Sequence, residues 1–184
     1  MAIIYELWAE CKDEESIQRL ADHFSGLTFT LLNGRMINWG VGVEKSSVDA
    51  YALTVSSRNL SSSGVRNLSD ALETTESGFR LYAHLKKAPE FRFARVAWEA
   101  ENIPMAELTD YVETAADGDR YLSLECVVDE ELYQHLGSPK LFHSFREGYW
   151  WNRYRGESYQ PLYSNDQPAL NELCRQLLPE YFSY

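Results

Sequence analysis

Residues 27–43 read LTFTLLNGRMINWGVGV, and they carry the clearest structural signal in the chain. Apolar and polar side chains alternate on both sides of the dipeptide Asn33-Gly34. This dipeptide favours a two-residue turn, because both of its residues accept positive φ angles. The stretch therefore predicts a β-hairpin with strands over 27–32 and 35–43, which is typical of an antiparallel sheet.

Further elements are predicted on both sides of the hairpin. Upstream, a strand over 3–10 precedes an amphipathic helix that is capped by Asp13 and ends at Gly26. Downstream, periodicity predicts a strand over 50–57, a helix over about 62–75, and strands over 79–86 and 91–98. The order strand, helix, strand, strand thus occurs twice, over 3–43 and 49–99. This order suggests a duplicated β-α-β-β unit, although no residue identity between the halves supports it.

The C-terminal part, residues 100–184, is predicted to extend this core with helices and strands. The expected elements are a helix over about 104–114, a strand over 121–127, a short helix from Asp129 to Leu136, an extended segment over 141–155 and a last helix capped by Asp166. The whole chain is interpreted as one domain over 1–184 with an α+β fold. A mixed, mainly antiparallel sheet is expected, with helices on one face.

Composition narrows the function classes. The N-terminus shows no basic stretch before an apolar run, and no apolar run reaches membrane length, so a cytoplasmic protein without a membrane partner is expected. The three cysteines are widely spaced, which argues against disulfides and zinc. Gly40-Val41-Gly42 lacks the third glycine of a dinucleotide loop and lies within a predicted strand. No cofactor, metal site or catalytic motif is predicted.

The charge of the chain is concentrated in one segment. The net charge is −11, and residues 99–131 hold 11 acidic residues against Arg120 alone. Such a segment repels phosphates and attracts basic proteins. On a helix over 104–114, the acidic side chains would share one face. The predicted partner-binding residues here are Glu107, Asp110, Glu113, Asp117 and Asp119. The alternative is that this face is merely solvated.

Residues 141–155 combine six aromatic side chains with three arginines. Tyr, Trp and Arg are enriched at binding hot spots, and the same mixture can stack on bases of single-stranded nucleic acid. In a strand the side chains would alternate between two faces, so one face could instead belong to the core. The predicted partner-binding residues of this segment are Tyr149, Trp150, Trp151, Arg153, Tyr154 and Arg155.

The preferred hypothesis is a non-enzymatic acidic binding or inhibitor protein, of immunity or regulatory type, that recognises a basic partner such as a nuclease or toxin. One alternative is a small enzyme with a site assembled from His135, His143, Glu147 and Tyr149, or with Cys126 as a nucleophile. The other is a nucleic-acid binder that uses residues 141–155 and a basic hairpin. The hairpin would carry Arg80, Lys86, Lys87, Arg92 and Arg95. The acidic net charge makes nucleic-acid binding the less favoured alternative.

Overall fold

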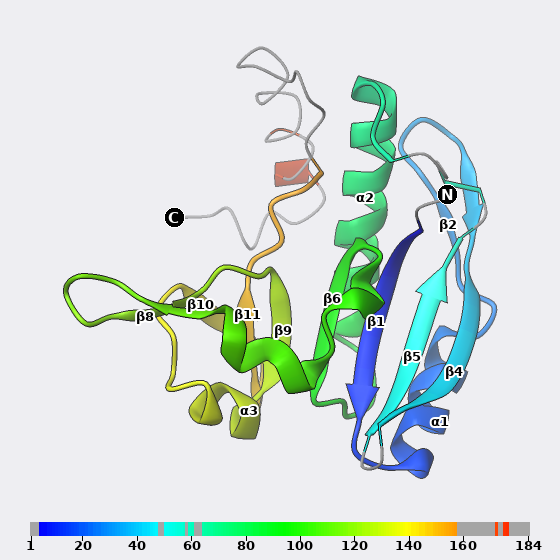
Figure 1. Cartoon of the computed structure of the whole chain (residues 1–184). Helices are drawn as coiled ribbons and strands as arrows, with labels where there is room; N and C mark the ends of the chain where they lie inside the picture. The colour runs from blue at the N-terminus through cyan, green and yellow to red at the C-terminus, as the bar shows by residue number, and fades with distance from the viewer. Residues whose placement is uncertain are drawn as a thin grey trace.

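The computed structural model describes residues 4–47, 50–57, 59–60, 64–157, 172 and 175–176. Its centre is an antiparallel seven-stranded sheet in the order β10-β11-β9-β6-β1-β5-β4 (Figure 1). The strands are β1 (Tyr5–Cys11), β4 (Gly40–Ser47), β5 (Ala50–Ser56), β6 (Phe93–Trp98), β9 (Cys126–Asp129), β10 (Phe142–Arg146) and β11 (Tyr149–Asn152). The predicted α+β class is confirmed.

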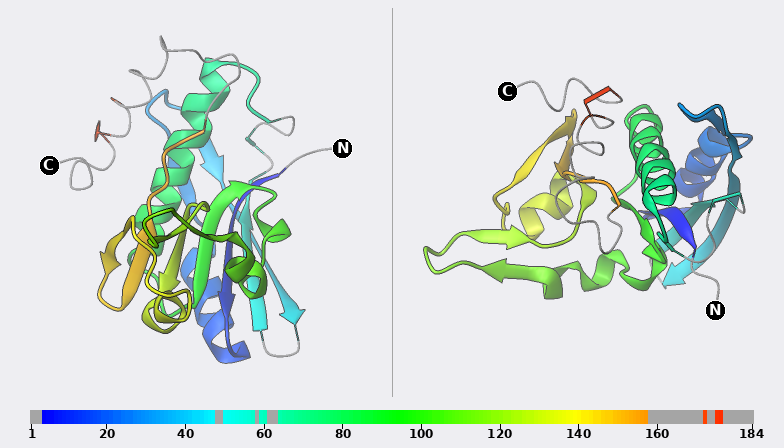
Figure 2. Two further views of the ribbon diagram at one scale, coloured as in Figure 1. Left: turned by 60° about the vertical axis from the view of Figure 1, so that its left-hand side comes forward. Right: turned by 90° about the horizontal axis from the view of Figure 1, so that it is seen from above.

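Two long helices, α1 (Glu14–Phe24) and α2 (Leu68–Leu85), cover one face of this sheet (Figure 2). As predicted, Asp13 caps α1, because its carboxylate accepts the Ser16 N–H at 2.7 Å. Leu20 and Phe24 on the apolar stripe of α1 are fully buried. The predicted placement of the helices on one face therefore holds for the two long helices.

The N-terminal part of the sheet has a recognisable topology. The chain runs β1-α1-β4-β5-α2-β6, and these strands lie in the order β6-β1-β5-β4. This is the split β-α-β arrangement of ferredoxin-like folds. Strands β9, β11 and β10 extend the sheet beyond β6. The predicted duplication of a β-α-β-β unit is not confirmed, since a single strand, β6, follows α2 in this topology.

The strand predicted over 79–86 is wrong, because residues 68–85 form one helix. The alternation of Phe79, Leu81 and Leu85 with polar residues suggested a strand. In the helix these three side chains and Tyr82 are all buried, because α2 is covered around most of its circumference. The helix is capped by Asn67, whose side chain accepts the Asp70 N–H at 2.9 Å, and its first residue is Leu68. It therefore starts six residues later than predicted and continues ten residues further.

The predicted hairpin forms, but it belongs to a small separate sheet. Strands β2 (Thr28–Thr30) and β3 (Met36–Asn38) pair with each other, and the chain then enters the main sheet at β4. Trp39 separates β3 from β4 because its side chain is buried and its N–H donates to Leu27 O at 3.0 Å. The strand predicted over 35–43 is thus divided into two.

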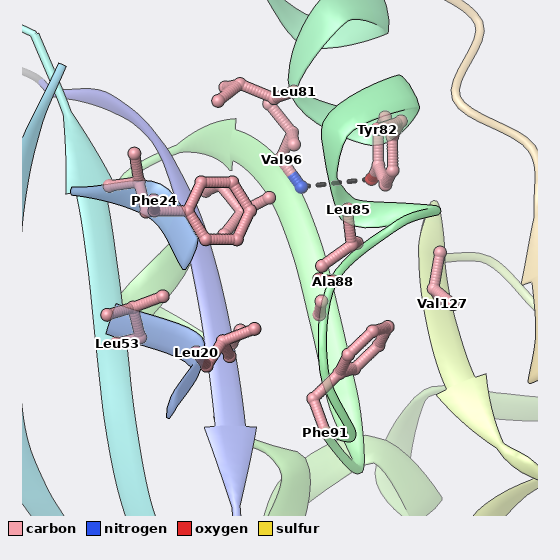
Figure 3. Close-up of a cluster of buried hydrophobic side chains, with 14 of the residues drawn as sticks. Leu20, Phe24, Leu53, Leu81, Tyr82, Leu85, Ala88, Phe91, Val96 and Val127 are labelled. Atoms are coloured by element: carbon pink, nitrogen blue, oxygen red, sulfur yellow. Dashed lines mark hydrogen bonds between the residues drawn. The ribbon is translucent and has the colours of Figure 1, made fainter. Parts of the chain in front are cut away.

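The larger core lies between the two long helices and the sheet. Figure 3 shows Leu20 and Phe24 from α1 gathered with Leu81 and Leu85 from α2 over the strands. The Val96 N–H donates to the buried Tyr82 hydroxyl at 3.0 Å. This bond satisfies the one polar atom that the Tyr82 side chain brings into the core.

A second layer covers the opposite face of the sheet (Figure 2). It contains the 3₁₀ helices η1 (Ala100–Asn102) and η2 (Met105–Tyr111), the hairpin of β7 (Val112–Thr114) and β8 (Arg120–Leu122), and helix α3 (Glu130–His135). The helix predicted over 104–114 forms only in part, as a 3₁₀ helix over Met105–Tyr111. Val112 leaves the helical path to pair with Leu122, and β-branched residues such as this one favour strands.

The cap at Asp166 and most of the predicted last helix lie outside the described residues, although residues 172 and 175–176 are helical. Within the described ranges, no helix is both long and apolar enough to cross a membrane.

Candidate functional site

Residues 99–122, which we call the acidic layer, run across the face of the sheet opposite α1 and α2 (Figure 1). Their apolar side chains point inward, and Leu108 and Leu122 join a core with Trp8 and Phe93. Their carboxylates stay at the surface, and five of them are exposed: Glu101, Glu107, Asp110, Glu113 and Asp117. The fold thus gathers these carboxylates on one layer of the molecule.

The predicted helical face of Glu107, Asp110 and Glu113 does not exist. Glu107 and Asp110 lie on η2, whereas Glu113 lies on β7. Asp117 follows in the turn before β8, where the Gly118 N–H donates to Ala115 O at 2.9 Å. The carboxylates are therefore distributed along a layer instead of a helical stripe, and their common origin in one chain segment keeps them on one side of the sheet.

Two buried glutamates on β1 hold this layer against the sheet. Glu10 is 2% exposed, and its Oε1 accepts the Met105 N–H at 2.8 Å and the Trp8 Nε1–H at 3.0 Å. Glu6 is 3% exposed, and its Oε1 accepts the Glu101 N–H at 3.3 Å. Sequence reasoning did not find this pair. The sequence did contain a signal for it, because Glu6 and Glu10 lie four residues apart between apolar neighbours in the predicted strand.

Cations from distant elements neutralise part of the predicted acidic segment. Asp119 pairs with Lys140, and Glu125 lies 3.8 Å from the Arg155 guanidinium. Arg92, just before β6, pairs with Asp129 at 3.3 Å, and also with Glu131 at 3.4 Å. The segment 99–131 is consequently less negative in the fold than in the sequence.

The other carboxylates of the acidic layer have no ion pair with any Lys or Arg in the described ranges. They are Glu99, Glu101, Glu107, Asp110, Glu113 and Asp117. Their few hydrogen-bond partners are neutral side chains, backbone N–H groups or another carboxyl, as when Tyr121 donates to Glu113. The negative field of the layer is therefore concentrated on residues 99–117.

A groove separates η2 from α3. It has a volume of about 560 Å³, and Met105, Ala106 and Thr109 line one side. Leu132, His135 and Leu136 line the other side. A smaller cavity of about 170 Å³ continues from Thr109 and His135 toward β7 and β8. A concave surface thus lies directly beside the η2 carboxylates.

The structure places half of the predicted aromatic–arginine site in the core. Tyr149, Trp151 and Tyr154 are 9%, 1% and 3% exposed. The Trp151 ring packs against Tyr82 with 5.3 Å between the ring centroids. Tyr154 also packs against Tyr82 of α2, whereas Tyr149 packs against Phe91, so these three buried side chains cannot contact a partner at this surface. The alternative interpretation placed one face of residues 141–155 in the core, and this interpretation is correct for Tyr149 and Trp151.

The other predicted residues of this segment reach the surface to different extents. Trp150 is half-buried on the opposite face, where it stacks on Tyr133 with 4.4 Å between the ring centroids. Arg153 is half-buried and Arg155 is exposed. Trp150 is already stacked on a ring of the protein, so it does not offer a free platform for a base.

The four residues of the enzyme alternative do not share a cavity in the described structure. His135 lines the η2–α3 groove, and His143 is exposed on β10. Glu147 and Tyr149 line a different cavity of about 330 Å³, and the Tyr149 hydroxyl is already bonded to the Phe91 backbone. This set therefore does not form a catalytic constellation of the expected kind.

The Cys126 thiol is also unsuited to nucleophilic attack. Its side chain is fully buried in the core beneath the acidic layer. Burial raises the pKa of Cys126 to about 12, so the reactive thiolate is scarcely populated near neutral pH.

The basic hairpin of the nucleic-acid alternative is not formed. Arg80 lies within α2, where it pairs with Glu76, and Lys86 and Lys87 follow the end of that helix. Arg92 is engaged with Asp129, as described above. These cations therefore belong to different elements instead of one hairpin.

The described residues contain no group of three or more His, Cys, Asp or Glu side chains placed to hold a metal ion. Comparison of the chain with protein-family models, with curated proteins and with solved structures gives no match.

The buried Glu6 carboxyl makes stability depend on pH. Burial, followed by its hydrogen bond to the Glu101 carboxyl, raises the pKa of Glu6 to about 8. The folded state thus holds this proton more tightly than the unfolded chain does, and stability falls as pH rises from about 5 to about 8. Burial raises the pKa of Glu125 to about 7, which acts in the same direction.

We expect the free energy of unfolding to fall by about 1–2 kcal/mol between pH 6 and pH 9, measured by urea denaturation at each pH. In Glu6→Gln, which cannot ionise, this fall should be clearly smaller. Glu44→Gln on the exposed part of β4 serves as the control and should retain the wild-type slope. An unchanged slope in Glu6→Gln would show that Glu6 stays ionised in the fold.

Proposed function

We propose that this chain is a non-enzymatic binding protein whose acidic layer recognises a basic protein surface. The observation that carries the proposal is the set of six carboxylates in residues 99–117 without an ion pair to the described Lys and Arg side chains. Nearby carboxylates repel one another, and an opposite charge on a partner relieves that repulsion. A lysine- and arginine-rich surface is the partner chemistry that fits.

The attachment of the layer supports the same proposal. The buried side chains of Glu6 and Glu10 fix the backbone at residues 101 and 105 through hydrogen bonds. A charged surface that is already ordered loses less conformational entropy on binding than a flexible acidic tail. A concentrated field also steers an oppositely charged partner and raises the association rate.

Basic surfaces that grip phosphates are common on nucleases, and an acidic protein that covers such a surface blocks access to it. An inhibitor of immunity type is therefore the role that this surface supports best. The charge pattern favours this role over nucleic-acid binding, since the same carboxylates repel a phosphate backbone.

The test compares two variants that lose the same number of charges. The first neutralises the acidic layer through Glu107→Gln, Asp110→Asn, Glu113→Gln and Asp117→Asn. The second neutralises four exposed carboxylates elsewhere, Glu14, Asp22, Glu44 and Glu147, through the corresponding amides. Each protein is immobilised and exposed to a host extract, and captured proteins are identified by mass spectrometry across a salt gradient.

We expect wild type and the second variant to retain the same basic partner, and the first variant to lose at least about tenfold in affinity, since each tenfold corresponds to about 1.4 kcal/mol. Affinity of the wild type should fall as salt rises. The proposal fails if the first variant binds the partner as tightly as wild type does, or if the captured partner is acidic at the contact surface.

A further inference from the structure

The groove between η2 and α3 has the features of an anchor site. Its floor and walls include the buried side chains of Leu132 and Leu136 and the partly buried side chain of Met105. Ala106 and Thr109 at its edge are exposed, so the groove opens to solvent. Interfaces commonly place one apolar side chain of the partner in such a depression, and polar contacts around it exclude water.

Acidic side chains lie around this groove, and Arg92, which also lines it, is already paired with Asp129 and Glu131. Glu107 and Asp110 follow the lining residues Ala106 and Thr109 directly in η2. Glu131 lines the opposite side, where it shares Arg92 with Asp129. The two η2 carboxylates have no ion pair within the described ranges, so they are available to cations of a partner.

We propose that the groove holds an apolar side chain of the basic partner, and that lysines or arginines flanking this side chain pair with Glu107 and Asp110. This inference rests on the proposed function and specifies the chemistry of the partner's contact segment. The segment combines one or two aliphatic residues with basic residues on either side. Apolar burial supplies affinity in the groove, and the charge pairs around it fix the position of the segment.

Charge complementarity selects this occupant over two others. A second copy of this chain would bring another surface with the same excess of carboxylates, and the chain as a whole carries a net charge of −11. A nucleic acid would bring phosphates to the same carboxylates. Both occupants would be repelled at the rim of the groove, whereas a basic segment is attracted there.

Two labelled six-residue peptides of equal charge test the inference. One places two leucines between pairs of lysines, and the other has glycines in place of the leucines. Dissociation constants are measured at low salt by fluorescence anisotropy. Ala106→Trp fills the edge of the groove, and Ala116→Trp adds the same side chain at an exposed position in the β7–β8 turn.

We expect the leucine peptide to bind wild type about tenfold or more tightly than the glycine peptide. Ala106→Trp should abolish this preference and Ala116→Trp should retain it. In wild type, the leucine peptide should also shift the amide resonances of Met105, Thr109 and Leu136 more than the glycine peptide does. This second measurement needs no variant, so it tests the groove independently of any effect of Trp on folding.

The results separate the two proposals. If both peptides bind wild type equally and both lose affinity in the four-carboxylate variant, the acidic layer binds basic segments but the groove inference is overturned. If resonance shifts from the leucine peptide lie outside η2 and α3, the groove inference is likewise overturned. If neither peptide binds at low salt, both proposals fail.

Discussion

Gly78→Ala should destabilise the protein by about 3 kcal/mol, the upper part of the usual range for overpacking a core. A Cβ at this position of α2 would collide with the Tyr5 hydroxyl and would lie 2.6 Å from Cε1 of Tyr154. Both rings are buried, and their hydroxyls are hydrogen-bonded to each other at 2.6 Å. Neither ring can therefore withdraw without breaking that bond or moving a strand.

Alanine is normally favoured over glycine in a helix interior by about 1 kcal/mol. A loss of stability in Gly78→Ala would therefore indicate that the new methyl group collides with its neighbours. Urea denaturation should show the loss as a lower midpoint. Gly42→Ala is the matched control, since a Cβ there meets nothing within 4 Å, and alanine in a strand should be neutral or stabilising by about 0.5 kcal/mol.

A double-mutant cycle with Tyr5→Phe checks the cause. Removing the Tyr5 oxygen takes away the atom closest to the new methyl group, so Tyr5→Phe should cost less in the Gly78→Ala background than in wild type. Strict additivity of the two substitutions would mean that the strain of Gly78→Ala is relieved elsewhere, and that the close approach of α2 to β1 is not its source.

The same helix shows where periodicity failed to predict the fold. Phe79, Leu81 and Leu85 alternate with polar residues, as they would in a strand, but Tyr82 is buried too. A helix enclosed by the sheet and by residues 149–157 buries nearly all of its sides, so its apolar pattern has no single period. By contrast, α1 has one exposed face, and its cap and apolar stripe were predictable from Asp13 and Leu20.

The candidate site was predictable only in part, because its acidic residues are adjacent in the sequence whereas their partners and their packing are not. The acidic segment over 99–131 was predictable from the sequence, because its acidic residues greatly outnumber its basic ones. Their pairing with Arg92 and Lys140 was not visible, since these cations lie at least about twenty residues away along the chain from the carboxylates they meet. Tyr149 and Trp151 resemble interface residues in composition, yet the packing of Trp151 against α2 and of Tyr149 against Phe91 makes them core residues.

Glu10→Ala should also cost about 3 kcal/mol, because two donors, the Met105 N–H and the Trp8 Nε1–H, would lose their acceptor. Trp8 is 3% exposed, so water cannot readily replace the carboxylate there. Glu10→Gln retains a side-chain oxygen at the position of Oε1, which accepts both of these bonds, and it should lose clearly less stability. Urea denaturation measures both losses, with the exposed Glu44→Ala as the control.

Glu10→Ala should act on the acidic layer as well as on global stability. The amide of Met105 loses its partner, so hydrogen exchange should accelerate at residues 100–111 more than in α1. Every surface carboxylate remains in this variant, yet affinity for a basic partner should fall, because the layer must now be ordered on binding. Unchanged exchange at Met105 would show that the layer is held by its apolar core around Leu108, and that the buried carboxylate is not its anchor.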